Sequence, residues 1–436
     1  MINKKLKNFL KRNLVKNFLL IFTGQGISSI LMLISTVIVI KAVGSEQHGI
    51  LIVTQTYALL FYGLVSFKTF QALIKFLAKA RKEKNNEKIK MYIKWSFVLD
   101  IGSLIVMFIV GMLLQDPVIH LMRWPKEIKT YILIFLFSQL FYLQGTTIGV
   151  LRSYEKYNYV IKSQIISSII RVVGYIGCFI LSKTLFAFIL FEIIASMVNY
   201  ILLIVYTVKV LKEEKLMDFY KVNLRYDKEF ISFNIFSNLT STLDLPINQI
   251  TQFIINRYLG FTANSVYNVF TKLGSIVNKL GDPINQIIYP EMSKKVVDGD
   301  FEGAKKLSHK LKLLMGFIFI IMTAGTLITY PLWFHYFISE PNKYIFAFVV
   351  YLAFISYSNA AMGTHNLFMS LGYVKYNIPI LLIINSIYLV ALFYMIQSLG
   401  LIGVISAYLI QAIGVVWVKE IILKKNNYKE YSLRRG

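Results

Sequence analysis

Apolar stretches of about 20 residues, separated by short clusters of Lys, Arg, Asp and Glu, alternate along almost the whole chain. A helix of that length crosses roughly 30 Å of hydrocarbon, and a soluble core would mix its charges more evenly. Of the 436 residues, 56% are hydrophobic and only 16% are charged, a balance that soluble domains rarely have. The pattern therefore predicts an all-α integral membrane protein.

We expect about twelve membrane spans, joined by short loops. The two spans near residues 234–251 and 265–286 are the most polar, so hydropathy identifies them least well. The spans are expected at roughly residues 17–40, 49–74, 93–114, 130–151, 160–181, 185–208, 231–256, 264–289, 311–335, 344–369, 376–397 and 400–422.

Lys and Arg are distributed unevenly between the two sides of this topology. With the amino terminus inside, the cytoplasmic segments hold about 34 of the 47 basic residues and the external loops about 7. The bias predicts a multi-pass protein of the cell membrane with both termini in the cytoplasm. It also explains the formal net charge of +25 without a nucleic-acid partner, because basic inner loops beside anionic lipid are the usual membrane pattern.

A long charged segment separates six expected spans from six others. We expect an N-terminal lobe at residues 1–208, a cytoplasmic linker at 209–229 and a C-terminal lobe at 230–436. Each lobe begins with a helix pair that turns after a glycine, at KAVGSEQHGI in the first lobe and NRYLGFTANSV in the second. This similarity suggests an internal duplication, which is how many transporters are built.

The sequence contains none of the short motifs that would indicate ATP hydrolysis or catalysis. GxxxxGK[ST], HExxH, CxxC and GxSxG are all absent. The single cysteine, Cys178, has no partner for an intramolecular disulfide, and the five histidines are scattered. We therefore expect no cofactor, no metal site and no enzymatic activity, so the chemistry of this chain is binding and movement.

The eighth span carries a polar face inside an otherwise apolar sequence, SVYNVFTKLGSIVNKLGDPINQ. Counting from Ser265 by steps of three and four, which follow one face of a helix, reaches only polar residues: Asn268, Lys272, Ser275, Lys279, Asp282 and Gln286. A charge at the centre of a spanning helix costs roughly 2.5 to 3.5 kcal/mol, so such residues normally face a bundle interior or a wet cavity. We expect Lys272 and Lys279, with Asn268 beside them, to bind the cargo.

Other polar residues lie inside neighbouring spans. The seventh span has a similar face that includes Asp244 and Asn248, next to an expected kink at Pro246. Arg171 and Glu192 fall at similar depths on the fifth and sixth spans, so they form either an intramembrane ion pair or part of a cargo site. Both interpretations stay open at the level of sequence.

The interior charges sum to a positive value in this arrangement. A single Asp244 cannot balance Lys272, Lys279 and Arg171, and a cationic, water-accessible cavity predicts an anionic cargo. The amides and hydroxyls on the same faces suit a cargo that carries hydroxyl groups as well as phosphate.

Four charged residues in the expected spans each have more than one possible role. Asp244 and Glu192 are candidates for binding a coupled cation, although Asp244 could instead neutralise Lys272. Lys68 and Lys75 are weaker candidates for the cargo site, because they lie near the cytoplasmic end, where long side chains reach the headgroups.

Three stretches of the chain resemble the polysaccharide-lipid flippases of the MOP superfamily, the Wzx-like exporters of lipid-linked oligosaccharides. They are FTGQGISSILMLISTVIVIKAVGSEQHGILIVTQ, INRYLGFTANSVYNVFTKLGSIV and PINQIIYPEMSKKVVDGDFEGAKKL. The third is the most specific, with a helix that ends in YPEMS before a short Gly-Asp loop. The similarity in pattern covers nearly the whole chain.

This resemblance implies two six-helix lobes around a central cavity that opens alternately to either side. It implies a polyprenyl-pyrophosphate-linked oligosaccharide as cargo, such as an undecaprenyl pyrophosphate intermediate of O-antigen or capsule synthesis, with other polysaccharide-assembly proteins as partners. Lys272, Lys279 and Arg171 are the positions that fit the cationic cavity of such a flippase.

Two main alternatives remain for the function. A MATE-like small-molecule exporter would have a similar fold, although an exporter of organic cations is expected to have an acidic cavity. A membrane glycan polymerase is disfavoured by the short external loops and the missing acidic motif. A scaffold for polysaccharide assembly would not require the intramembrane charges.

Overall fold

The computed structural model describes residues 2–67, 69–243 and 245–425, and all regular elements in these ranges are helical. Within them, the side chains of residues 2–19, 240, 241, 246, 248, 277, 279–290, 297, 319, 374 and 375 are outside the description. The chain forms two compact units, Met1–Leu245 and Pro246–Gly436. The expected all-α architecture is confirmed.

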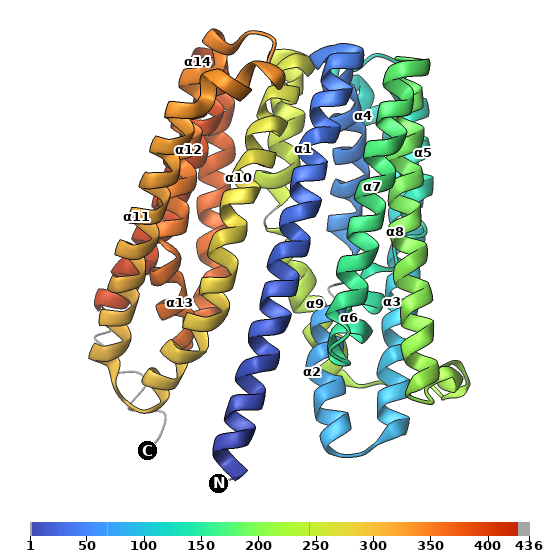
Figure 1. Cartoon of the computed structure of the whole chain (residues 1–436), viewed down its shortest axis with the longest axis vertical. Helices are drawn as coiled ribbons and strands as arrows, with labels where there is room; N and C mark the ends of the chain where they lie inside the picture. The colour runs from blue at the N-terminus through green and yellow to red at the C-terminus, as the bar shows by residue number, and fades with distance from the viewer. Residues whose placement is uncertain (1, 68, 244, 426–436) are drawn as a thin grey trace. The chain divides into compact units, whose positions relative to one another are not determined.

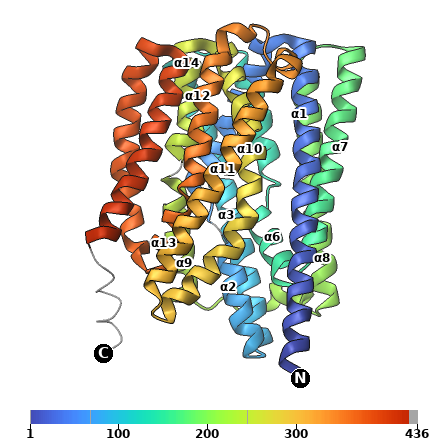
Figure 2. The ribbon, with the colours of Figure 1, turned by 60° about the vertical axis from the view of Figure 1, so that its left-hand side comes forward.

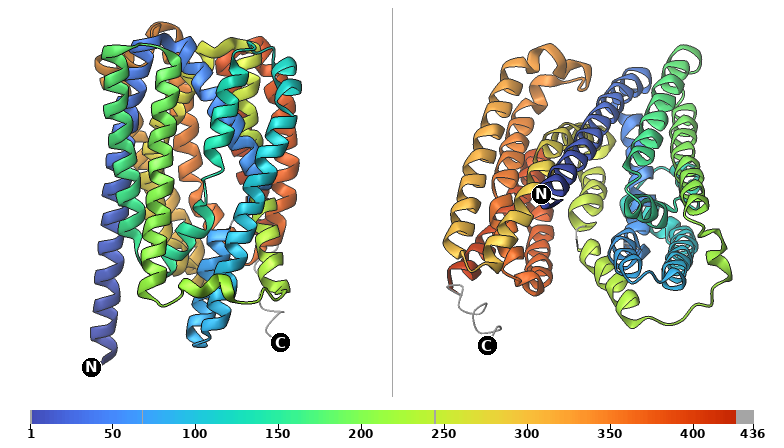
Figure 3. Two further views of the ribbon diagram at one scale, coloured as in Figure 1. Left: turned by 90° about the vertical axis from the view of Figure 1, so that its right-hand side faces the viewer. Right: turned by 60° about the horizontal axis from the view of Figure 1, so that its bottom comes forward.

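The first unit, residues 1–245, is a bundle in which α1 packs on α7, α7 packs on α8, and α2 packs on both α3 and α6 (Figures 1 and 3). Its buried core includes Phe76, Tyr92 and Phe230, whose rings contact one another. Its helices are α1 (Ile2–Val65), α2 (Thr69–Lys82), α3 (Asn86–Leu113), α4 (Gln115–Met122), α5 (Ile128–Gln139), α6 (Gln144–Ser153), α7 (Tyr157–Leu181), α8 (Leu185–Glu213), the 3-10 helix η1 (Met217–Lys221) and α9 (Lys228–Thr242).

The second unit, residues 246–436, is a bundle in which α11 and α12 run side by side and α13 packs against α10 and α11 (Figure 2). Phe270, Phe334 and Phe348 form an aromatic core between α10 and its neighbours. Its helices are the π-helical turn η2 (Pro246–Ile250), α10 (Thr251–Val297), α11 (Phe301–Trp333), η3 (Phe334–Tyr336), α12 (Pro341–Ala360), α13 (Met362–Ser370), η4 (Tyr373–Tyr376) and α14 (Asn377–Lys425).

Glycines divide the three longest helices into pairs of spans. The backbone leaves helical geometry at Gly44 in α1 (φ 83°, ψ 166°), at Gly260 in α10 (φ 85°, ψ 176°) and at Gly400 in α14 (φ 57°, ψ −135°). Positive φ is accessible to glycine at little cost, which is why the chain can bend sharply there. The turns predicted at KAVGSEQHGI and NRYLGFTANSV are confirmed, and their nearly identical dihedral angles support the inferred duplication.

Eight stretches in the described part of the chain are long and apolar enough to cross a membrane. Two of them, Leu20–Val65 and Asn377–Lys425, contain two expected spans each, so the eight account for ten of the twelve expected spans. The two that hydropathy does not identify are the polar spans near 231–256 and 264–289, which correspond to α9, η2 and α10.

Several expected boundaries are wrong in detail. The expected span 49–74 ends early, because α1 stops at Val65 and Thr69 begins a separate amphipathic helix, α2. One face of α2 is buried and carries Ala72, Leu73, Phe76, Leu77 and Ala80, whereas the other face carries lysines. The expected spans 130–151 and 344–369 are each interrupted, between α5 and α6 and between α12 and α13.

The seventh expected span is interrupted close to Pro246, where the sequence predicts a kink. Helix α9 ends at Thr242, and η2 and α10 follow after the break. Helix α9 packs against α1 and α2, with Asn238 Nδ2 donating a hydrogen bond to the carbonyl oxygen of Ser66. The boundary between the compact units therefore lies after Leu245, beyond the charged 209–229 segment where we expected the lobes to separate.

Candidate functional site

The polar face of the eighth span lies on α10 and is partly accessible. Asn268, Lys272 and Ser275 are half-buried, whereas Val269 and Phe270, on the apolar side of the helix, are fully buried. The hydroxyl of Ser275 donates to the carbonyl oxygen of Lys272 over 2.7 Å, so this serine is satisfied within its own helix. Leu273 and Ile276 of the apolar side are also half-buried and Ser265 of the polar face is buried, so cargo binding by Lys272 stays a prediction.

Other site residues named from the sequence lie outside the described residues or side chains. Lys68 and Asp244 are among the residues that the structure does not describe, and the side chains of Lys279 and Asn248 are likewise outside the description. The proposed pairing of Asp244 with Lys272 therefore stays a prediction.

Arg171 and Glu192 form an ion pair between α7 and α8. Nε of Arg171 lies 2.7 Å from Oε2 of Glu192, and the hydroxyl of Tyr175 donates to the same oxygen over 2.9 Å. The two charged side chains are only 18% and 12% exposed. Because a buried charge needs a partner, this arrangement confirms the ion-pair interpretation and leaves Arg171 neutralised by a neighbouring helix.

Lys75 projects from the exposed face of α2 toward α9. Its Nζ lies 3.5 Å from Oε1 of Glu229 and 4.7 Å from the centre of the Phe233 ring, and its side chain is 52% exposed. These contacts account for the position of Lys75 on the surface, and its role as a weaker cargo candidate stays a prediction. Exposed ion pairs of this kind contribute little to stability.

A buried carboxylate in the first unit joins α3, α2 and α6. Oδ1 of Asp100 accepts a hydrogen bond from the Thr69 hydroxyl over 2.7 Å, and Oδ2 accepts from the backbone N–H and the hydroxyl of Thr146 over 2.6 and 2.7 Å. Asp100 is 7% exposed. The N-cap of α6, Leu143, has no side-chain cap, so the carboxylate of Asp100 satisfies an N-terminal amide of that helix from another helix.

Sequence reasoning missed the structural importance of Asp100. The sequence places a lone aspartate in the span 93–114, which favours a position at the membrane interface. No motif in the sequence marks this contact. In the structure, a Cβ at Gly145 would lie 2.1 Å from Oγ1 of Thr69 and 2.8 Å from Oδ1 of Asp100. Glycine thus permits the close approach of α6 to the carboxylate.

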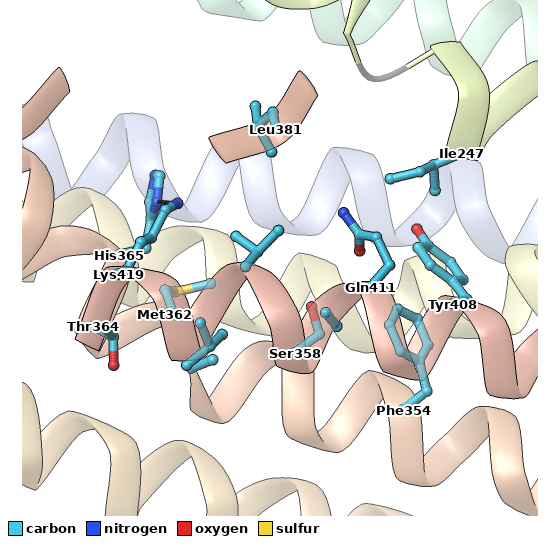
Figure 4. A pocket seen from close by; sticks show the side chains of 14 residues that line it. Ile247, Phe354, Ser358, Met362, Thr364, His365, Leu381, Tyr408, Gln411 and Lys419 are labelled. Carbon is cyan, nitrogen blue, oxygen red and sulfur yellow. Dashed lines mark hydrogen bonds between the residues drawn. The ribbon is translucent and has the colours of Figure 1, made fainter. Parts of the chain in front are cut away.

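The second unit contains a cavity of about 320 Å³ among η2, α12, α13 and α14 (Figure 4). His365 and Lys419 lie side by side toward one end of it, and Tyr408 and Gln411 lie toward the other. The remaining lining is mostly apolar, with Ile247, Phe354, Ser358, Ala361, Met362, Thr364, Leu381, Ala412, Val415 and Val416.

Lys419 places a positive charge at the wall of this cavity although only 5% of its surface is exposed. Its Nζ lies 2.9 Å from Nδ1 of His365 and 5.6 Å from the centre of the Phe368 ring. A charged Lys419 donates to His365, which keeps the imidazole neutral in that arrangement. Sequence reasoning did not single out Lys419 and missed the cavity, because its other walls come from distant helices.

Polar residues of α12 and α13 mostly connect helices of the second unit. Nδ2 of Asn359 donates to Oδ1 of Asn278 over 2.8 Å, and the hydroxyls of Ser370 and Ser293 lie 3.1 Å apart. Gly363 packs directly on the backbone of α11, since a Cβ there would lie 2.5 Å from the carbonyl oxygen of Ser308. Small residues and interhelical hydrogen bonds of this kind hold membrane helices together.

Comparison with known families decides what kind of membrane protein these helices form. The family model for polysaccharide biosynthesis proteins matches residues 14–296, well over half of the chain. This chain belongs to the polysaccharide biosynthesis protein family. The match includes the two glycine turns and the polar faces of the seventh and eighth spans.

Relatives and solved structures agree with this family and its membrane setting. The Inner membrane protein YghQ of Escherichia coli (strain K12) is 20% identical over 323 residues, which are 73% of this chain and 90% of that protein. The fold of this polysaccharide biosynthesis protein is similar to a MATE family transporter of the MOP superfamily in an inward-facing conformation, with a TM-score of 0.73, 13% identity and coverage of 92% and 96% of the two chains.

A second solved structure gives the same fold. A mutant form of the Vibrio cholerae MATE transporter VcmN matches with a TM-score of 0.64 and 12% identity over 98% of both chains. At such identities the similarity shows the fold alone. The family and the fold together support a multi-pass membrane flippase or exporter, as the sequence predicted.

Proposed function

We propose that this polysaccharide biosynthesis protein is a flippase that moves an anionic polyprenyl-pyrophosphate-linked oligosaccharide from the inner to the outer leaflet of the cytoplasmic membrane by alternating access. The observation that carries the proposal is the presence of intramembrane cations in a member of this family. Lys272 lies on the accessible face of α10, and Lys419 lines the cavity of the second unit. Both termini lie in the cytoplasm in this proposal.

Arg171 supports an anionic cargo less than the sequence suggested. Glu192 already compensates the guanidinium of Arg171, so that ion pair contributes little net charge to a cargo site. We therefore assign Arg171 and Glu192 to holding α7 on α8, and we retain Lys272, Lys279, Asn268 and Asn248 as the cargo-binding residues. In this proposal Asp244 remains the candidate for a coupled cation.

The direction of transport follows from the charge of the cargo. A pyrophosphate linkage carries about two negative charges, and with the cell interior negative each charge gains about 2.3 kcal/mol per 100 mV on moving outward. The membrane potential then favours export without ATP hydrolysis, and the protein works as a transporter with no catalytic centre. Other polysaccharide-assembly proteins would supply and consume the cargo on the two sides.

A flipping assay in liposomes tests this proposal. Purified protein is reconstituted with a fluorescent polyprenyl-pyrophosphate oligosaccharide, and quenching by a membrane-impermeant reagent reports the fraction in the outer leaflet. We expect protein-dependent flipping that is strongly reduced in a double variant, Lys272→Ala with Lys279→Ala, and retained in Lys272→Arg with Lys279→Arg. The double variant Lys82→Ala with Lys212→Ala removes the same charge from two exposed surface lysines and serves as the control.

Each outcome separates the proposal from its alternatives. Equal loss in the control variant would show that charge alone, rather than the α10 face, matters. Flipping unaffected by the α10 substitutions would make these lysines structural. Export of a small organic substrate with no flipping of any anionic lipid-linked sugar would identify a MATE-like exporter, and polymerised product would indicate a glycan polymerase.

A further inference from the structure

A second, basic cavity of about 370 Å³ lies where α11 begins and α14 ends, within the second unit. On α11, its lining residues recur every three or four positions and so share one face of the helix. The lining consists of Lys305, Ser308, His309 and Lys312 of α11, Thr364 and Leu367 of α13, and Glu420, Leu423 and Lys424 of α14. This cavity is separate from the one that His365 and Lys419 line, although Thr364 contributes to both.

Glu420, the carboxylate in the lining of this basic cavity, already has hydrogen-bond partners in the same lining. Oε1 of Glu420 accepts a hydrogen bond from Nζ of Lys312 over 2.5 Å and from the hydroxyl of Thr364 over 3.3 Å. Lys305 and Lys424 take part in none of the ion pairs that the structure describes. Three lysines against one glutamate leave the lining with a formal charge of +2, and the exposed Lys305 and Lys424 make this cavity attractive to an anion.

The lining has the chemistry that recognises phosphate. Lys305 of α11 and Lys424 of α14 supply two point charges, and His309 adds a ring nitrogen. Ser308 adds a hydroxyl group from an almost fully buried residue, whereas the Thr364 hydroxyl already donates to Glu420. Lysines are common phosphate ligands, and hydroxyl donors complete the coordination of the remaining oxygens.

The surface next to the basic cavity favours a lipid over a soluble phosphate. Immediately beyond Lys312, α11 exposes Leu313 and Phe317, which are 62% and 63% exposed. On α14, Trp417 is 63% and Ile421 41% exposed, within two turns of Lys424. Exposed apolar side chains on spanning helices face the acyl chains, and tryptophan is enriched at the headgroup level.

We propose that the basic cavity binds the phosphate headgroup of an anionic membrane lipid, with the acyl chains lying along the apolar surfaces of α11 and α14. Basic pockets between transmembrane helices bind such headgroups on the cytoplasmic side, where the leaflet is anionic. The lipid holds the first turns of α11 and the last turns of α14 together through Lys305 and Lys424. The site goes beyond the proposed flippase activity and does not require it.

Lipid binding to the purified protein tests this site. Native mass spectrometry and thermal unfolding in detergent are measured with added dioleoyl phosphatidylglycerol, dioleoyl phosphatidylcholine or inorganic pyrophosphate. The double variant Lys305→Gln with Lys424→Gln is compared with Lys82→Gln and Lys212→Gln, which remove two exposed lysines from the first unit. We expect phosphatidylglycerol to bind and stabilise the wild type and the control, and to bind the cavity variant roughly 30-fold more weakly.

Three outcomes would overturn the proposal. Equal stabilisation by phosphatidylcholine would show that the headgroup charge is irrelevant. If the control variant bound phosphatidylglycerol as weakly as the cavity variant, the loss of binding would follow from net charge and not from this cavity. Stabilisation by pyrophosphate but not by phosphatidylglycerol would assign the cavity to a soluble anion. Unchanged flipping in the cavity variant would leave the proposed function intact, so failure here and failure there are distinguishable.

Discussion

Replacing Asp100 tests whether its carboxylate holds α2 and α6 on α3. In Asp100→Ala, the backbone N–H of Thr146 loses its acceptor in a buried site, which costs about 1 to 3 kcal/mol. The truncated side chain and the lost hydroxyl contacts add to this cost, while relief of a buried charge offsets part of it. We expect a net destabilisation of about 2 to 4 kcal/mol.

The conservative variant Asp100→Asn separates hydrogen bonding from charge. Its amide oxygen can still accept from the Thr146 N–H, and its amide group can donate to the Thr69 hydroxyl, so we expect a loss of only about 1 kcal/mol. Unfolding is followed by tryptophan fluorescence in mixed micelles as the mole fraction of sodium dodecyl sulfate increases. Thr146→Ser, which retains both donors, serves as the control.

Two results for the Asp100 variants would contradict this role of the carboxylate. If Asp100→Asn were as unstable as Asp100→Ala, the negative charge itself would be required, and the carboxylate would have a role other than accepting three hydrogen bonds. If Asp100→Ala were as stable as the wild type, the amide of Thr146 would have found another acceptor and the tether would be dispensable.

Three further predictions follow from the geometry. Arg171→Met alone leaves Glu192 buried without its partner and should cost about 3 to 5 kcal/mol, whereas adding Glu192→Leu should restore most of the loss in the same micelle assay. Gly363→Ala should lower the melting temperature because its Cβ meets the backbone of α11, whereas Gly325→Ala, with open space around it, should be neutral or slightly stabilising. Burial raises the pKa of Asp227, but hydrogen bonds from the Phe230 N–H and the Tyr92 hydroxyl outweigh it, so the pKa lies below the ordinary 3.8. That carboxylate therefore stabilises the fold above pH 3.8, and the stability difference between wild type and Asp227→Asn should shrink as the pH falls below 3.8; a difference that grows on acidification would contradict the assignment.

The architecture was largely predictable because hydrocarbon imposes strict rules on a chain. Segments of about 20 apolar residues must be helices in a membrane, and positive φ at a turn favours glycine, so the spans and the turns at Gly44 and Gly260 could be located from the sequence. The polar face around Lys272 followed from helical periodicity alone. Each of these features depends on residues that are close together in the sequence, so the sequence pattern is enough to predict it.

Side-chain partners, by contrast, depended on tertiary structure. Sequence alone could not decide whether Arg171 bound cargo or Glu192, because the answer depends on how α7 packs on α8. Asp100 looked like an interfacial residue until α6 brought the amide of Thr146 to it, and Lys419 belongs to a cavity whose other walls come from distant helices. Periodicity defines which face of a helix a residue occupies, but only packing determines what that face meets.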